Sequence, residues 1–534
     1  MLRLSSLAAA LVLAAAPAGA ASVDPERISA HVRTLASDAF EGRGPGTAGE
    51  DKTIAYLTRE FAAAGARPGG RDGAWTQEVE MVRFTVSRPA TPQIAGGACP
   101  ASIGRSLIAW SRKSGGRVAV KDAPLVFVGF GVSAPDKQWD DFAGLDVRGK
   151  VAVVLTNDPD FAQATGPFRG ADMTYYGRWS YKVEELARRG AAGAIVIHEE
   201  GPTGLPWALI ETVYRQPMLD IPRGPGERVG FESWLPYTEA EKLFACAGRD
   251  LGAWKAMAQK PAFRGGRLGE LSLSLDFDVT AETQVTRNVL ARLPGARRPG
   301  ETVVVTAHWD HMGIGAPDST GDTIYNGALD NAGGVAGLLE LARTLAAGPP
   351  LDRSVLFLAV TLEERGLLGA EYYAANPVWP LEKTVGGINM DAVNFFGPVD
   401  NMTLSGYGAN ELEDWLREAL AERGRKLLPN PNDAVGFYFR SDHFPFVKRG
   451  VPVLFAGAGW DIADRLKNVR DPEVGARFHQ PSDEWGEDLD FKAAAADMEV
   501  YRALLTRLAN SDWWPGWKPG WEFGRPTPGA AAAS

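Results

Sequence analysis

Imidazole and carboxylate side chains gather in the C-terminal half of the sequence. Four of the six histidines lie beyond residue 300, at His308, His311, His443 and His479, and aspartates and glutamates surround them. This region contains no cysteine, so a metal site there would use nitrogen and oxygen ligands, which suit zinc or another borderline divalent ion. Carboxylates can also bridge two ions about 3.5–4 Å apart, so five ligands can serve two metals when one carboxylate is shared.

The candidate ligands follow apolar runs that are typical of buried strands. They are His308 after residues 303–305, Glu363 and Glu364 after 355–360, and Asp391 after 385–390. The runs alternate with helical segments such as 331–347, which predicts a parallel sheet covered by helices on both faces. Ligands of such sheets bind at the carboxyl ends of the strands. We therefore expect these side chains to converge on one site.

Each acidic position also allows a structural interpretation. The side chains of Glu363 and Glu364 point in different directions because the residues are adjacent, so one can bind a metal while the other acts as a general base. The alternative is a solvated acidic turn, which the preceding apolar strand disfavours. Asp330 is either a ligand or a helix N-cap, and taken alone it favours the cap. Asp310 is either an acceptor for a ligating imidazole or a turn residue.

Five motifs in this region occur in an order that resembles a known family. Together they resemble the secreted zinc aminopeptidases of metallopeptidase family twenty-eight, which also contains glutamate carboxypeptidases and glutaminyl cyclases. The resemblance covers about residues 24–95 and 275–510. The motifs are HWDH at 308–311, GALDNAGG at 327–334, EE at 363–364, NMD at 389–391 and FHQPSD at 478–483.

The resemblance implies an α/β fold of the zinc-exopeptidase type, a three-layer α/β/α sandwich with a mostly parallel central sheet. It also implies two zinc ions per chain, although cobalt or manganese could occupy the same ligands. His308 and Asp391 would hold one ion. Glu364 and His479 would hold the other, and Asp330 would bridge the two.

The resemblance further implies an aminopeptidase that releases N-terminal residues from peptides through a metal-bridging hydroxide. Glu363 would be the general base, and Asp310 would orient His308. One departure concerns Phe478, because several members of the family have a tyrosine there that stabilises the oxyanion. Loss of one oxyanion donor can cost on the order of 10²–10³ in rate.

A second segment resembles the family's substrate pocket. Residues 440–443 (RSDH) precede an apolar patch, so Asp442 or His443 would bind the substrate amine or brace a ligand. A structural hydrogen-bonded pair is the alternative.

Three other functions remain open. A glutaminyl cyclase is a one-zinc acyltransferase, and the five-ligand set argues against it. A glutamate-type carboxypeptidase requires a basic pocket for a terminal carboxylate, which the sequence does not identify. A non-catalytic binding protein on the same fold would have lost its ligands, whereas this chain retains the ligand set and Glu363.

The middle of the chain resembles a protease-associated domain, a β-rich insertion without catalytic residues. We therefore expect a discontinuous catalytic domain at 22–95 and 275–515, interrupted by the insertion at 96–274. The Trp-rich and Pro-rich residues that follow, from 516, are expected to pack back onto the catalytic domain, and the tail from about residue 525 to 534 is expected to be disordered.

Composition limits the other function classes. The 534 residues carry a net charge of −10 and no basic run, which argues against a nucleic-acid partner. Residues 1–21 have a basic start, a short apolar run and small residues, as in a secretory signal, so we expect an exported protein, periplasmic or secreted, without a membrane span in its mature form. The expected partners are peptides with a free N-terminus. Export also allows a disulfide between Cys99 and Cys246, with two separate buried thiols as the alternative.

Overall fold

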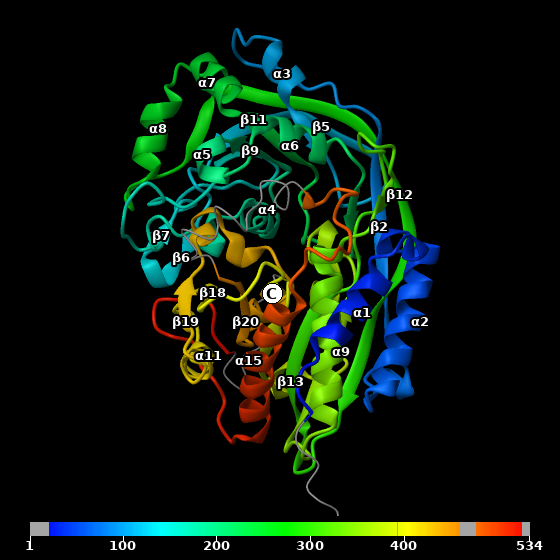
Figure 1. Cartoon of the computed structure of the whole chain (residues 1–534). Coiled ribbons are helices and arrows are strands. Elements are labelled where there is room, and N and C mark those ends of the chain that lie inside the picture. Colours follow the sequence, from blue (N-terminus) through cyan, green and yellow to red (C-terminus); the bar gives the residue numbers. More distant parts are fainter. Residues whose placement is uncertain (1–20, 392, 460–476, 526–534) are drawn as a thin grey trace, which may run out of the picture.

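The computed structural model describes residues 21–391, 393–459 and 477–525 and has a mixed α/β fold around one long sheet, shown in Figure 1. One half of the sheet contains, in spatial order, β19 (Lys426–Pro429), β18 (Asn401–Ser405), β20 (Val453–Ala458), β17 (Thr384–Asn389), β13 (Arg298–His308) and β16 (Arg353–Val360). It continues through β12 (Gly266–Leu293), β5 (Gly116–Phe127), β8 (Val151–Leu155), β9 (Gly193–His198), β11 (Glu232–Pro236) and β4 (Ile108–Trp110). Most neighbouring strands on this path are parallel, which confirms the predicted α/β class.

The central strands are apolar throughout because both faces of the sheet are covered. On β16, Phe357 belongs to a core that lies on one face, and its neighbour Leu358 belongs to a separate core on the other. This alternation follows from the two-residue period of a strand. The first face is covered by α1 (Pro25–Leu35), α2 (Ala48–Ala63), α9 (Gly333–Ala346), α11 (Leu412–Ala421) and α15 (Phe491–Asn510), and the second by α10 (Leu368–Ala375) and α12 (Phe444–Val447).

Strand β12 joins the two halves of the sheet. Its first part pairs with β5 and β3 (Gln93–Ala95), its middle pairs with β2 (Thr76–Arg88), and its end pairs with β16. In Figure 1 this strand runs along one side of the molecule and links the region of β9 and β11 to the region of β13. The domain boundary expected at residue 275 lies inside β12, and the proposed domain limits stay a prediction.

The middle region has its own hydrophobic cores, built from residues 82–279. Its helices are α3 (Ser102–Ser106), α4 (Trp179–Arg188), α5 (Glu200–Thr203), α6 (Trp207–Tyr214), α7 (Tyr237–Cys246) and α8 (Leu251–Ala258). Its short strands are β6 (Ser133–Ala134), β7 (Trp139–Asp140) and β10 (Met218–Asp220). Three other short strands lie outside the middle region, namely β1 (Arg67–Pro68), β14 (Gly313–Ile314) and β15 (Ile324–Tyr325). Cys99 and Cys246 form a disulfide in this region.

The described part of the C-terminal segment packs against the rest of the protein, as expected. Trp513 and Trp514 lie against the core under α15, and Trp517 and Trp521 join an aromatic cluster that includes Tyr438. The expected signal segment, apart from residue 21, and the tail beyond residue 525 lie outside the described residues. Among the helices that the structure describes, none combines the length and apolar character needed to cross a membrane.

We predict that the disulfide makes a measurable contribution to the stability of the protein. Replacing both Cys99 and Cys246 by serine should lower the thermal unfolding midpoint, because cross-links that close long loops typically contribute about 2–4 kcal/mol. Differential scanning fluorimetry under non-reducing conditions would measure the shift. A reductant should lower the midpoint of the wild type to that of the double variant and leave the variant unchanged. Equal midpoints for oxidised wild type and variant would contradict this expectation.

Candidate metal centre

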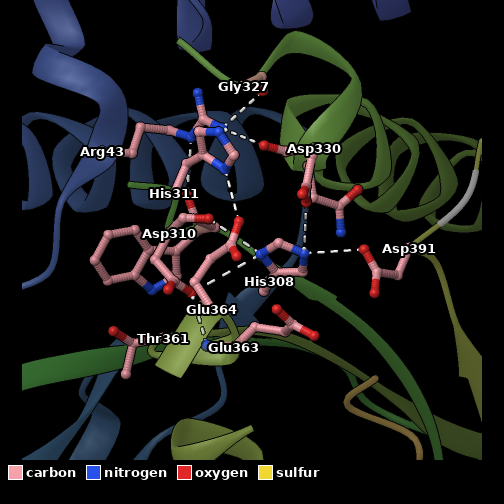
Figure 2. A network of polar contacts seen from close by, with 12 residues as sticks. Arg43, His308, Asp310, His311, Gly327, Asp330, Thr361, Glu363, Glu364 and Asp391 are labelled. Carbon is pink, nitrogen blue, oxygen red and sulfur yellow. Dashed lines mark hydrogen bonds and ion pairs between the residues drawn. The ribbon is translucent and has the colours of Figure 1, made fainter. Parts of the chain in front are cut away.

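Three of the five predicted ligands, together with Glu363, come together at the carboxyl ends of three neighbouring strands. Strands β17, β13 and β16 are adjacent and parallel. His308 is the last residue of β13, Glu363 and Glu364 form a turn after β16, and Asp391 follows β17. Figure 2 shows these side chains pointing toward one another. The convergence follows from parallel pairing, since it places the three strand ends at one edge of the sheet.

Two histidines lie on either side of Asp330. Nε2 of His308 is 3.2 Å from one Asp330 oxygen, and Nε2 of His479 is 3.0 Å from the other. His308 Nε2 is also 2.9 Å from Asp391 Oδ1, and His479 Nε2 is 3.2 Å from Glu364 Oε2. Thus His308 contacts Asp391, His479 contacts Glu364, and both histidines contact Asp330.

The backbone before the glutamate pair has an unusual conformation. Leu362 is fully buried and has φ 57°, in the left-handed region that costs a non-glycine residue about 1–3 kcal/mol. The chain turns sharply here, and the two glutamates that follow belong to different groups of possible ligands. Glu363 groups with His308 and Asp391, whereas Glu364 groups with His308 and Asp330.

Asp330 does not cap the following helix, although the residue alone favoured a cap. Helix α9 begins at Gly333, and Ala332 occupies the N-cap position. The carboxylate of Asp483 accepts hydrogen bonds from the main-chain N–H groups of Leu329 and Asp330 and so holds this segment in place. Asp330 is therefore free to direct its side chain at His308 and His479.

His308 is oriented by the main chain of Asp310. The Nδ1–H group of His308 donates to the Asp310 carbonyl oxygen at 3.0 Å, while the Asp310 carboxylate lies 3.9 Å from Nδ1. That carboxylate accepts a hydrogen bond from the Glu363 main-chain N–H at 3.1 Å. Asp310 thus contacts both the β13 end and the glutamate turn.

Segment 440–443 reaches the same site. Ser441 donates a hydrogen bond to the Asp391 carboxylate. Asp442 and His443 are fully buried, and their side chains have no hydrogen-bond partner among the described residues, so they do not form the structural pair considered above. Phe478 is 58% exposed and its ring stacks on His479.

Two further residues of the site were not identified as such from the sequence. His311 donates from Nδ1 to Glu364 Oε1 at 2.7 Å, and its ring lies against that of His479. The HWDH motif contained this signal, because His311 lies three residues after His308. Arg43 was missed altogether, since it lies in a Gly-rich loop more than 250 residues away in sequence.

Arg43 supports the loops that carry the ligands. It is fully buried and donates to the carbonyl oxygens of Trp309, Asn326, Gly327 and Leu35 at 2.6–2.9 Å. Figure 2 shows Arg43 beside Gly327. Burial lowers its pKa to about 10, although Asp483 and Asp330 oppose the shift. The guanidinium therefore stays charged at neutral pH. Gly327 must remain a glycine, because a Cβ there would lie 2.6 Å from the His311 ring.

The charges of the site fit bound cations. Burial raises the pKa of Glu363 and of Asp442 well above their ordinary values, and the nearby Asp391 carboxylate adds to both shifts. Such shifts mean that the ionised forms lack sufficient positive charge nearby. Within each of the two groups of possible ligands, ligand atoms lie within 4.8 Å of one another. Their nitrogen and oxygen atoms suit zinc.

The role of Arg43 predicts the effect of removing its charge. Arg43→Met should destabilise the protein by about 3–5 kcal/mol, because the buried carbonyl oxygens lose their donors. The thermal unfolding midpoint would report the loss. Arg59→Met is a matched control because the Arg59 side chain is 64% exposed and pairs with Glu60 at the surface. Equal midpoints for the two variants would show that Arg43 does not support these loops.

Comparison with known proteins shows that the segment carrying this site is similar to a known family. Residues 288–504 match the family model described as Peptidase family M28, and this segment contains every predicted ligand and Glu363. A probable zinc metalloprotease of Leptosphaeria maculans is 37% identical over 106 residues, which cover 20% of this chain and 24% of that protein. Leucine aminopeptidase 2 of Trichophyton equinum is 29% identical over 212 residues, covering 36% of this chain and 39% of that protein.

The match to these curated relatives thus spans well under half of their length. A solved structure of an aminopeptidase from Aneurinibacillus sp. strain AM-1 matches over 92% of this chain and 95% of that chain, with a TM-score of 0.50 and 18% identity. This likeness shows the fold. The segment that carries the candidate centre is therefore similar to peptidase family M28, and the chain has the fold of a solved aminopeptidase.

Proposed function

We propose that the chain is an exported zinc aminopeptidase that hydrolyses N-terminal residues of peptides. The observation that carries this proposal is the position of Asp330, whose two carboxylate oxygens each lie about 3 Å from a different histidine, His308 and His479. A carboxylate shared in this way suits two neighbouring metal ions. The similarity of residues 288–504 to peptidase family M28 supports the same function.

In this proposal, His308 and Asp391 hold one zinc, Glu364 and His479 hold the other, and Asp330 is shared. Zinc bound there would lower the pKa of a water molecule and polarise the scissile carbonyl group. The hydrogen bond from His308 Nδ1 to the Asp310 carbonyl fixes the tautomer of that ring, so that Nε2 faces the site.

Glu363 is the proposed general base. Its carboxylate belongs to the same group as His308 and Asp391, and its main-chain N–H is held by Asp310. It would accept a proton from the attacking water and donate that proton to the leaving amine. Bound cations would oppose the nearby carboxylates that raise the pKa of Glu363, and would thereby favour the ionised form that a base needs.

Asp442 is the proposed partner of the substrate's α-ammonium group. Both of its carboxylate oxygens are buried, and among the described residues neither has a hydrogen-bond partner. An ionised carboxylate without a partner is costly inside a protein, and an ammonium group would satisfy it. This would give the enzyme its requirement for a free N-terminus.

The two enzymatic alternatives have less support. A one-zinc glutaminyl cyclase would not need Asp330 between two histidines. The name of the leucine aminopeptidase relative also favours the aminopeptidase over a carboxypeptidase. With Phe478 in place of tyrosine, the oxyanion would depend on the second zinc or on another donor. We also propose that residues 96–274 form a protease-associated insertion, since none of the predicted ligands lies there.

Glu363→Gln should remove nearly all turnover and leave the metal bound. The amide cannot accept the proton, and general-base catalysis contributes about 10²–10⁴ in rate. Release of 4-nitroaniline from leucine 4-nitroanilide would measure turnover, with N-acetyl-leucine 4-nitroanilide as the substrate that lacks a free amine. Glu382→Gln, at an exposed position, is the control variant. Activity retained by Glu363→Gln would refute the assignment of the base.

The purified protein should contain about two zinc ions per chain. Elemental analysis by mass spectrometry would count them, and Asp330→Asn should reduce the count because the shared ligand is weakened. Chelation should lower both the turnover and the thermal midpoint, since ligand binding stabilises the folded state, and added zinc should restore both. One zinc per chain would favour the cyclase, and a metal-free, fully stable protein would favour a binding role.

A further inference from the structure

The segment 361–369, which carries both glutamates of the candidate centre, has a constrained backbone. Three of its residues have a positive φ, namely Leu362 (57°), Gly366 (105°) and Leu367 (63°). This region of backbone conformation is unfavourable for a leucine, and it persists only where the surrounding structure enforces it. The shape of the segment, and with it the direction of Glu363 and Glu364, therefore depends on contacts with other parts of the chain.

The two ends of this segment are joined by Asn288, a buried residue of β12. The main-chain N–H of Gly369 donates to the Thr361 carbonyl oxygen at 3.0 Å. Asn288 Oδ1 accepts a hydrogen bond from the Thr361 main-chain N–H, and its Nδ2 donates to the Gly369 carbonyl oxygen, both at 3.0 Å. Strand β12 thus closes the segment at its ends, whereas the residues between the ends need other contacts.

Apolar contacts support the leucines between these ends. Leu362 and Leu368 are buried in one cluster with Val79, Met81 and Ile221. Ile221 belongs to the middle region and directly follows β10, which pairs with β2. Val79 and Met81 lie two residues apart on β2 and so share one face of that strand. The two leucines therefore rest on side chains from β2 and from the end of β10.

An ion pair from the same stretch of the middle region reaches helix α10. Arg223 donates from Nη1 and Nη2 to the two carboxylate oxygens of Glu371, at 2.8 and 3.1 Å. Two parallel hydrogen bonds of this kind fix the orientation of the groups as well as their distance. Burial opposes ionisation of Glu371, but the charge and hydrogen bonds of Arg223 outweigh it and lower the pKa of the carboxyl group to about 2. The pair is therefore fully charged at neutral pH.

The Arg223 side chain is itself held by a buried carboxylate. Its Nε donates to Asp220 Oδ1 at 3.0 Å, and Asp220 is fully buried. Arg228 donates from Nε to the other oxygen of Asp220 at 2.7 Å. Only 13% of the Arg223 side chain is exposed. Because its guanidinium is bonded to Asp220 and to Glu371 at once, Arg223 joins the end of β10 to α10.

These contacts lie next to the proposed catalytic group. Leu362 directly precedes Glu363, and α10 begins at Leu368, five residues after it. A general base must lie within about 2.6–3.2 Å of the proton that it accepts. A misplacement of about 1 Å, caused by a change far from the reacting atoms, can cost about 10² in rate. A small shift of α10 or of Leu362 would therefore lower turnover without removing a ligand.

We propose that Arg223 is a positioning residue that holds segment 361–369, and with it Glu363, in place from the middle region. This inference rests on the proposed peptidase function. It gives the middle region a part in catalysis, although none of the predicted ligands lies there. Arg223 acts through Glu371 and α10, whereas Ile221 supports the same segment through Leu362 and Leu368.

Steady-state kinetics of the full-length enzyme with leucine 4-nitroanilide would test this role. Arg223→Met should lower kcat at least tenfold, change KM less than threefold and leave the zinc content unchanged. Arg228→Met is the matched control, because Arg228 pairs with the same carboxylate and its side chain is similarly exposed, 10% against 13%. It should lower kcat less than threefold. Equal losses in the two variants would mean that these arginines only stabilise the fold, and the proposal would be wrong.

Glu371→Gln tests the same pair from the side of α10. Glu371 is partly exposed, so this variant is expected to fold even if Arg223→Met does not. It should also lower kcat at least tenfold. The double variant Arg223→Met/Glu371→Gln should match the slower single variant within twofold, because all three variants remove one interaction. Losses that multiply in the double variant would contradict action through this pair.

Hydrogen–deuterium exchange separates this proposal from the proposed function. In chelator-treated protein, the amide groups of the proteolytic fragment that covers 361–371 should exchange at least fivefold faster in Arg223→Met than in the wild type. Arg228→Met should match the wild type within twofold. Unchanged exchange in Arg223→Met overturns the positioning role, whether or not the protein is a peptidase. If the wild type hydrolyses no aminoacyl nitroanilide, the proposed function fails, and the exchange rates decide whether Arg223 holds this segment.

Discussion

The crowding of carboxylates at one edge of the sheet is the constraint on which the site depends. Asp330, Glu363, Glu364 and Asp391 each place an oxygen within 4.8 Å of a His308 nitrogen, and partial burial limits the screening of their charges by water. Such a cluster is stable only if cations or donors compensate it. The surrounding structure supplies hydrogen-bond partners to the backbone and leaves the carboxylates to the imidazole groups and to each other, an arrangement that suits a metal centre.

The charged groups that hold this arrangement come from distant parts of the chain. Arg43 fixes the loops at 309 and 326–327 through their carbonyl oxygens, and Asp483 fixes the N–H groups at 329–330. Each uses a charged group to satisfy main-chain atoms. The ligand side chains are therefore not needed to satisfy these main-chain atoms. Their positions depend on Arg43 and Asp483 as well as on the strands.

The middle region of the chain is closely connected to the region that carries the candidate centre. Strand β12 continues from one into the other, so the two share a single sheet. Arg223, near β10, forms ion pairs with Glu371 on α10, the helix that directly follows the glutamate turn. This pair places a charged group of the middle region beside an element that directly follows the site.

The sequence by itself determined the elements and the chemistry of the ligands. Continuous apolar runs ending at His308, at Glu363 and at Asp391 predicted parallel strands, because a strand buried on both faces has no polar alternation. The shared role of Asp330 came only from the family resemblance, since the residue alone suggested a helix cap. Tertiary structure alone decided the contacts of Arg43 and of His311. These residues lie in loops without periodic patterns, and their partners are chosen by packing between segments that are far apart in the chain.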